Sequence, residues 1–229
     1  MILVIMYHIL YDLKFIYGKD IPSFLTPGNH GFEIFHTGFL WVLFAVSGIC
    51  AGYSRNSLKR GALLYILGWG ITAATSIFMP SELIVFGVIS CFGACMVITA
   101  LIKPFLDKIP WQGLLAFALV MWIVFRNFHR GSIWLIFTEI NIPRLTGLDY
   151  LYPIGIRSDT FRSADYFPII PYYFMFLAGN ALYRPISEHK LPGWFYRIRS
   201  GAVGFIGRHS LIIYAVHQPL LLILFELVF

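Results

Sequence analysis

Long apolar runs alternate with short polar segments along the whole chain. Several of these runs reach the roughly 20 residues that a helix needs to cross a bilayer. Alternation with a period of two over about ten residues, typical of transmembrane barrel strands, does not occur in the sequence. The pattern therefore predicts an all-α fold, a polytopic transmembrane helix bundle with about seven spans. We expect these spans at residues 1–17, 36–53, 61–79, 82–102, 112–127, 166–183 and 208–228.

Two further segments carry apolar residues without the length of a span. The stretch 133–138 is too short to cross, and we expect it to be re-entrant or interfacial. The stretch 194–203, WFYRIRSGAV, mixes aromatic residues with arginines, which is typical of a helix lying in the cytoplasmic interface. Since no polar stretch is long enough to fold separately, we predict a single integral-membrane domain over residues 1–229.

The composition agrees with a protein that lives in the lipid bilayer. Hydrophobic residues make up 59% of the 229 positions and charged residues 12%, whereas a soluble domain carries about a quarter of its residues as charges. The cysteines Cys50, Cys91 and Cys95 all lie in apolar runs, and their odd number argues against a disulfide framework. Their spacing does not resemble a zinc site, so we expect no metal.

The positive charges are distributed unevenly over the predicted loops. With the N-terminus in the cytoplasm, the short outer loops 18–35 and 80–81 hold only Lys19. Lys and Arg gather on the cytoplasmic side of membrane proteins, so we expect a cytoplasmic N-terminus and an extracytoplasmic C-terminus. The net charge of +6 then calls for no nucleic-acid partner. An extra span within the long outer loop 128–164 would move the C-terminus to the other side. The cation-rich loops are 54–60, 103–111 and 184–207.

Two polar residues interrupt the first apolar run, MILVIMYHILYDL: His8 and Asp12. Residues four apart share one helix face, and ionisable groups inside a span usually face a cavity or a partner. A carboxylate that accepts from one ring nitrogen of His8 would fix its tautomer and leave the other nitrogen as a base. We therefore predict a proton-handling site; the alternative is a polar pair that locks the bundle.

Further histidines gather at two other places. PGNHGFEIFHTGF carries His30, Glu33 and His36 at the outer mouth of the second predicted span, where a histidine could act as nucleophile or base or could lie in a solvated loop. GRHSLIIYAVHQP places His217 inside the last span, before Pro219. Because proline removes a backbone donor and kinks a helix, this break predicts either a catalytic cavity or a water-filled polar kink.

Cations at the predicted inner face suggest a binding site for a polyanion. SRNSLKRG holds Arg55, Lys59 and Arg60, which serve either as a topology anchor or as a cradle for phosphates such as those of coenzyme A. Arg208 and His209 stand at the inner end of the last span. The other cations expected on this face are Arg184, Arg197 and Arg199. Glycines inside the spans are expected to permit close helix contacts, namely Gly48, Gly52, Gly68, Gly70, Gly87 and Gly93.

Five motifs occur in an order that resembles a known family: YHILYDL, FLWVLFAVSGICAGYSRNSLKRG, FGVISCFG, ADYFPIIPYYFMFLAGNALYR and FIGRHSLIIYAVHQP. Together they resemble bacterial membrane proteins related to the catalytic domain of heparan-α-glucosaminide N-acetyltransferase, within a wider clan of multi-span acyltransferases. The resemblance covers nearly the whole chain. Relatives usually begin with a further polar segment before the first span, whereas Met1 falls inside that span here, so we expect either a different start site or a shortened member. Relatives also often carry a histidine where Ser90 stands.

The resemblance implies acetyl transfer across a bacterial-type plasma membrane. Acetyl-CoA would bind from the cytoplasm, and an amine or hydroxyl of a saccharide or glycolipid acceptor would receive the acetyl group on the other side. Self-association into a homo-oligomer is left open. The catalytic candidates are His8, Asp12, His30, His36 and His217, and the donor-binding candidates are Arg55, Lys59, Arg60, Arg208 and His209.

The chemistry of acyl transfer fits these residues. The reaction needs a base for the acceptor and hydrogen-bond donors for the oxyanion. The histidines can supply the base, and Tyr11, Tyr214 and Gln218 are candidate oxyanion donors. The alternatives are a small-anion transporter without covalent chemistry, or a structural or sensory protein. Transporters often show repeated halves with matching broken helices, but the breaks here, at Pro168, Pro171 and Pro219, all lie in the C-terminal half.

Overall fold

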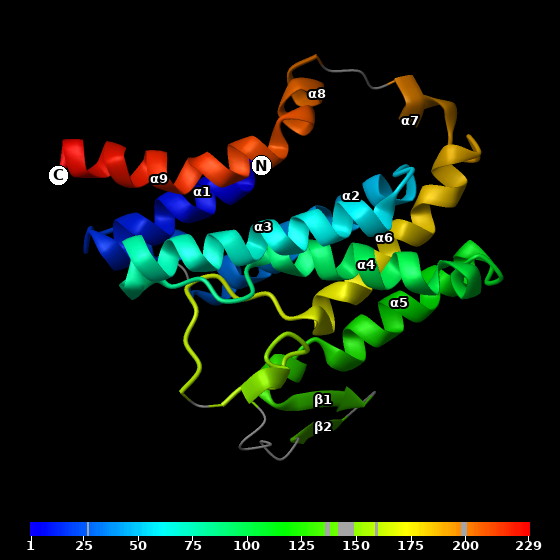
Figure 1. Cartoon of the computed structure of the whole chain (residues 1–229), viewed down its shortest axis with the longest axis horizontal. Coiled ribbons are helices and arrows are strands. Elements are labelled where there is room, and N and C mark those ends of the chain that lie inside the picture. Colours follow the sequence, from blue (N-terminus) through cyan, green and yellow to red (C-terminus); the bar gives the residue numbers. More distant parts are fainter. Residues whose placement is uncertain (27, 136–137, 142–148, 159, 198–200) are drawn as a thin grey trace. The chain divides into compact units, whose positions relative to one another are not determined.

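The computed structural model describes residues 1–26, 28–135, 138–141, 149–158, 160–197 and 201–229 (Figure 1). Most of these residues are helical, which confirms the all-α class. The described residues also contain one small β-hairpin. The helices are α1 (Ile2–Tyr11), α2 (His30–Gly52), α3 (Ser57–Phe78), α4 (Val88–Leu106), α5 (Trp111–Phe125), α6 (Ile169–Ser187), α7 (Gly193–Arg197), α8 (Gly201–Arg208) and α9 (Ser210–Val228). The strands are β1 (Ser132–Leu135) and β2 (Thr138–Asn141).

Within the described residues, five helical segments are long and apolar enough to cross a membrane. They agree with the second, third, fourth, fifth and last predicted spans. The first and sixth predicted spans correspond to α1 with its following turn and to α6, which are not among the five, so the count of about seven stays a prediction. The five segments are Ser23–Gly52, Ser57–Phe78, Val88–Leu106, Trp111–Arg130 and Ser210–Val228.

The chain forms two compact units. Unit 1 comprises Met1–Val42 and Leu191–Phe229, and unit 2 comprises Leu43–Lys190. In unit 1, α1 and α9 lie side by side (Figure 1). In unit 2, α3 packs on α4 and α5 packs on α6, and α4 also contacts α6. The fully buried rings of Phe44 and Phe176 mark the core of unit 2.

Helix α4 begins at Val88, later than the predicted residue 82. Pro80–Glu82 forms a separate 3₁₀ turn, and the segment after it pairs with a distant loop. The backbone N–H of Phe167 donates to the carbonyl of Phe86 at 3.1 Å, and Asp165 Oδ2 accepts from the N–H of Val88 at 3.2 Å. These long-range contacts cap α4, and they come from residues far away in the sequence.

Glycines allow the backbones of two helices to touch inside unit 2. A methyl group at Gly48 of α2 would collide with the backbone of Phe176 in α6, and one at Gly179 of α6 would collide with the backbone of Ala45 in α2. The side chain of Asn180 donates to the carbonyl of Gly48 at 3.2 Å. The close helix contacts predicted for the glycines are confirmed at Gly48, Gly52, Gly68 and Gly93. Gly87 precedes α4 and lies against the loop residues Asp165 and Ile84 instead, and a methyl group at Gly70 would meet nothing within 4 Å among the described residues, so the prediction is wrong for these two.

Residues 133–135 and 138 of the stretch 133–138 belong to the hairpin, and the re-entrant or interfacial position that we expected for this stretch stays a prediction. β1 and β2 are antiparallel, with Ile133 opposite Ile140 and Trp134 opposite Glu139, while residues 136–137 lie outside the described part. Hydrogen bonds from Ser132 and Asn127 to the Glu139 carboxylate lower its pKa below the usual value. The hairpin thus has both backbone and side-chain links.

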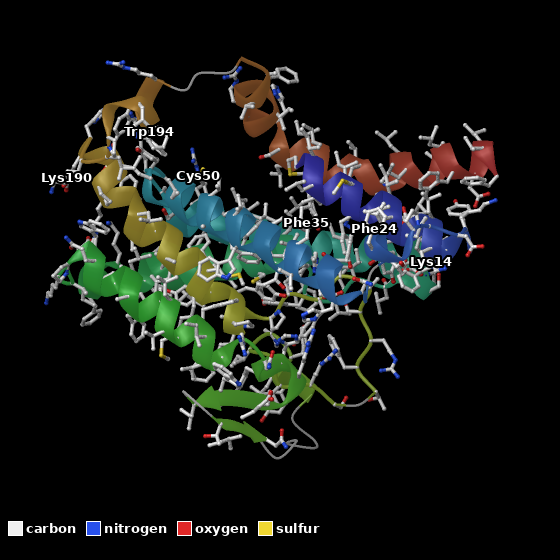
Figure 2. The ribbon with its side chains drawn as sticks, turned by 180° about the vertical axis from the view of Figure 1, so that it is seen from behind. Lys14, Phe24, Phe35, Cys50, Lys190 and Trp194 are labelled. Atoms are coloured by element: carbon white, nitrogen blue, oxygen red, sulfur yellow. The ribbon has the colours of Figure 1, made fainter. Side chains whose placement is uncertain are left out.

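The segment 194–203 is helical where it is described, as the end of α7 and the start of α8. Residues 198–200, including Arg199, lie outside the described part, and the interfacial position stays a prediction. Trp194 on α7 and Phe35 on α2 have exposed side chains (Figure 2). Exposed aromatic residues of this kind are typical of helices that meet lipid rather than water.

Candidate functional site

Helix α1 presents His8 and Asp12 one turn apart, as the spacing predicts. His8 is partly buried, and Asp12 is completely buried. At Asp12 the helix changes from α to π geometry: Asp12–Ile16 is a π turn in which the N–H of Tyr17 donates to the carbonyl of Asp12 at 2.9 Å. Single π turns are rare and occur frequently at functional sites, so Asp12 stands at the irregular point of this helix.

Helix α9 supplies the second histidine of the site. His217 is 7% exposed, and its Nδ1 lies 2.6 Å from the carbonyl oxygen of Tyr214. A carbonyl oxygen can only accept, so Nδ1 carries the proton of the neutral ring and Nε2 has a lone pair. Nε2 is buried and has no hydrogen-bond partner among the described residues. Nε2 of His217 can therefore accept a proton.

Four aromatic side chains bring α1, the first part of α2 and α9 together within unit 1. The rings of His8 and His217 meet edge-on, with centroids 4.9 Å apart. The ring of Tyr7 stacks on that of His36, with centroids 4.5 Å apart. No sequence pattern predicts this contact. Thus His8, His36 and His217, which are far apart in the sequence, belong to one cluster.

Next to the histidines, Asp12 is bound by Gln218 of α9. The Nε2 atom of Gln218 lies 3.0 Å from each carboxylate oxygen of Asp12. We predicted Gln218 as an oxyanion donor, but its amide group donates to Asp12 here. The idea that Asp12 fixes the tautomer of His8 stays a prediction.

His30 is not part of the ring contacts described for this cluster. It is the first residue of α2 and is exposed, so it starts a helix rather than lying in the loop that we expected. Glu33 accepts from the backbone N–H of Gly28 at 3.1 Å and thereby stabilises the start of α2. Within the described residues, no ring contact links His30 to the other histidines. A catalytic role of His30 stays a prediction.

The predicted donor-binding cations are divided between the two units. Arg55, Lys59 and Arg60 are exposed around the turn between α2 and α3 in unit 2. Arg208 is exposed at the end of α8 in unit 1, and Nδ1 of His209 lies 2.9 Å from the carbonyl oxygen of Phe205. Their joint role in binding a polyanion stays a prediction. Within the described residues, no group of three or more His, Cys, Asp or Glu side chains is placed to hold a metal ion.

Arg184, which we expected among the phosphate ligands, is engaged by the end of α4. Its guanidinium donates to the carbonyl oxygens of Ile109 at 2.5 Å and Leu106 at 2.7 Å and lies 3.3 Å from Asp107. The last carbonyl groups of a helix have no partner within the helix. Arg184 therefore acts as a C-terminal cap for α4.

Replacing Arg184 by glutamine should destabilise unit 2 without affecting donor binding. The lost hydrogen bonds involve a charged donor, and such bonds contribute about 1.5–3 kcal/mol each at most. We expect a lower midpoint of thermal unfolding in lipid nanodiscs, measured by tryptophan fluorescence. Arg55→Gln, at an exposed position, is the matched control and should leave the midpoint unchanged. An unchanged midpoint for Arg184→Gln would contradict the capping role.

Ser90 is the position at which the resemblance led us to expect a histidine in relatives. It is 4% exposed, on α4, and its side chain lies directly against Gly68 of α3. A methyl group at Gly68 would already collide with Ser90. An imidazole at position 90 would therefore need a different approach of α3 and α4, so Ser90 is a packing residue in this chain.

The comparison with protein families gives one match that extends over both units. The family described as "Heparan-alpha-glucosaminide N-acetyltransferase, catalytic" matches residues 1–219. The match includes all the candidate site residues described above. Comparisons with curated proteins and with solved structures give no match.

Proposed function

The chain belongs to the heparan-alpha-glucosaminide N-acetyltransferase catalytic-domain family, and we propose that it transfers an acetyl group from acetyl-CoA to an amine or hydroxyl of a saccharide-type acceptor. The acceptor would be a glycan or glycolipid. We place the donor on the cytoplasmic side and the acceptor on the other side of a bacterial-type plasma membrane. The N-terminus would then be cytoplasmic and the C-terminus extracytoplasmic.

The observation that carries this proposal is the pair formed in unit 1 by the buried His217 and the partly buried His8. Acyl transfer requires a base that removes a proton from the attacking amine or hydroxyl. His217 has an Nε2 atom that is buried and has no partner among the described residues, and its ring meets that of His8. Buried ionisable groups are costly in a membrane protein and usually have a function. The pair thus supports proton transfer at a partly buried site.

Two routes are compatible with these residues. In direct transfer, a histidine takes the proton of the acceptor while the acceptor attacks the thioester carbonyl, and the departing CoA sulfur receives a proton. In the two-step route, an imidazole nitrogen attacks the thioester and forms an acetyl-imidazole, CoA leaves as the thiol, and the acceptor then attacks this acetyl group. His8, His30 and His36 are the candidates for the acetyl carrier.

The cations would hold the donor. Arginine binds phosphate oxygens in a bidentate way, and lysine binds them as a point charge. We assign the phosphates of acetyl-CoA to Arg55, Lys59 and Arg60, which are exposed and surround a helix start capped by Asn56. Arg208 and His209 are further donor-binding candidates.

Acetyl-CoA should bind to the purified protein in nanodiscs in a saturable way. Incubation with acetyl-CoA and glucosamine as the probe acceptor should then release free CoA thiol, detected with a thiol reagent. Intact-mass analysis without the acceptor tests for an acetyl adduct, and peptide mapping would assign it to one histidine. Absence of both binding and thiol release from folded protein at millimolar donor would contradict the proposed function.

Removing the cations near the start of α3 should weaken donor binding specifically. For Arg55→Ala combined with Lys59→Ala and Arg60→Ala, we expect the Kd for acetyl-CoA to rise at least about tenfold, since charge-assisted hydrogen bonds to phosphates are lost. Lys108→Ala, at an exposed position of the turn after α4, is the matched control. Equal Kd values for the triple variant and the control would refute this assignment of the donor site.

A further inference from the structure

Two neighbouring pairs of side chains link α1 and the residue that follows it to α9. His8 meets His217, and one turn further along α1, Asp12 meets Gln218, the neighbour of His217 in the sequence. Because residues within one helix keep fixed spacings, a displacement of Asp12 relative to Gln218 also displaces His8 relative to His217. The geometry of the histidine pair therefore depends on the contact between Asp12 and Gln218.

The contact is built around a completely buried carboxylate. Asp12 is 0% exposed, and burying a carboxylate is costly unless it is hydrogen-bonded. A carboxylate accepts only, so the NH₂ group of Gln218 must face Asp12, with its nitrogen 3.0 Å from both oxygens. Gln218 thus has its side-chain orientation fixed by Asp12.

This arrangement has a cost that a purely structural contact would avoid. With its NH₂ group turned to Asp12, Gln218 leaves its Oε1 buried and without a hydrogen-bond partner among the described residues. A buried unsatisfied acceptor costs about 1–3 kcal/mol. An apolar pair at these positions would hold two helices together without that cost. The polar pair is therefore better explained by what it positions than by the stability it contributes.

We propose that Gln218 is a positioning residue: by holding Asp12 at the start of the π turn, it sets α1 against α9 so that the His8 and His217 rings meet. This inference rests on the proposed function, which gives the two rings their role in proton transfer. Gln218 acts through Asp12 and through the register of the two helices.

The test reads the distance between the rings independently of acetyl transfer. Protein labelled only at its 7 histidines, in nanodiscs, should show an inter-ring NMR cross-peak, assigned to the pair by its loss in His8→Ala and in His217→Ala. Gln218→Leu should remove this cross-peak. The double variant Asp12→Asn with Gln218→Glu exchanges donor and acceptor but keeps a hydrogen bond between the two positions, and it should restore the cross-peak.

A matched control breaks a different contact with α9, made by the residue that follows the π turn. Tyr17 donates its hydroxyl to Glu226 at 3.4 Å and to the carbonyl of Leu222 at 3.5 Å. Tyr17→Phe should leave both the cross-peak and the transfer rate unchanged. Persistence of the cross-peak in Gln218→Leu would overturn the proposal. Absence of the cross-peak from the wild-type protein or from the double variant would also overturn the proposal. If Gln218→Leu does not fold, the double variant alone serves as the test.

Kinetics supply a second readout. With acetyl-CoA and glucosamine, Gln218→Leu should lower kcat by about 10²-fold, the cost of a small misplacement of reacting groups, while KM for acetyl-CoA stays the same. A merely structural role would lower only the amount of folded protein and leave kcat per folded molecule unchanged. If the cross-peaks behave as expected and the wild-type protein releases no thiol, the proposed function fails and the positioning by Gln218 stands.

Discussion

Replacing His217 by alanine should lower kcat for acetyl transfer by about 10²–10⁴-fold, the usual contribution of a positioned general base. Nε2 of this ring is a buried acceptor without a partner among the described residues, and its tautomer is fixed by the hydrogen bond from Nδ1 to Tyr214. His8→Ala should have an effect of the same order, because the His8 ring lies against that of His217. Both rates are measured as thiol release with acetyl-CoA and glucosamine.

A second substitution at the same position separates the chemistry from the packing. In His217→Asn the amide nitrogen can take the place of Nδ1 and donate to the Tyr214 carbonyl, but nothing replaces Nε2. We therefore expect wild-type thermal stability and the same loss of kcat as in His217→Ala. His189→Ala, at an exposed histidine of unit 2, is the control and should have wild-type kcat. A His217→Asn variant with wild-type kcat would show that His217 is not the base.

The sequence predicts those features of the site that depend on one helix alone. The spacing of His8 and Asp12 places them one turn apart, and the apolar runs give the approximate bounds of α3, α5 and α9. These features follow from helix periodicity and hydropathy, which act over a few residues. The meeting of His8 with His217 could not be predicted, since it depends on how α1 packs on α9.

The errors also have a physical cause in long-range contacts. The start of α4 is set by Asp165, a residue of a distant loop, and the pairing of β1 with β2 was not predicted. Arg184 looked like a free cation because its partners at the end of α4 lie far away in the sequence. A single sequence indicates which residues are polar, but it does not indicate which distant backbone groups they satisfy.

The glycine contacts of unit 2 lead to the largest expected effect on stability. In Gly179→Ala, the added methyl group would collide with the backbone of Ala45 in α2. A rotamer change cannot relieve this collision, because the Cβ methyl group of alanine has no alternative position and the opposing atoms belong to the backbone. α2 and α6 must therefore move apart, with loss of the contact between Asn180 and the Gly48 carbonyl. Overpacking in a dense core costs about 1–3 kcal/mol and occasionally more. We expect Gly179→Ala to lower the free energy of unfolding by an amount at the upper end of this range or beyond it.

Gly70→Ala is the matched control for this prediction. Gly70 lies in α3, and among the residues that the structure describes a methyl group added there would meet no atom within 4 Å. Alanine there should raise the free energy of unfolding by about 0.5–1 kcal/mol, because glycine loses more conformational freedom in a helix. Thermal unfolding in nanodiscs, followed by tryptophan fluorescence, should thus shift in opposite directions for the two variants. Both variants add one methyl group and differ only in the surroundings of that group. Equal unfolding midpoints for the two variants would therefore mean that α2 and α6 do not approach each other through Gly179.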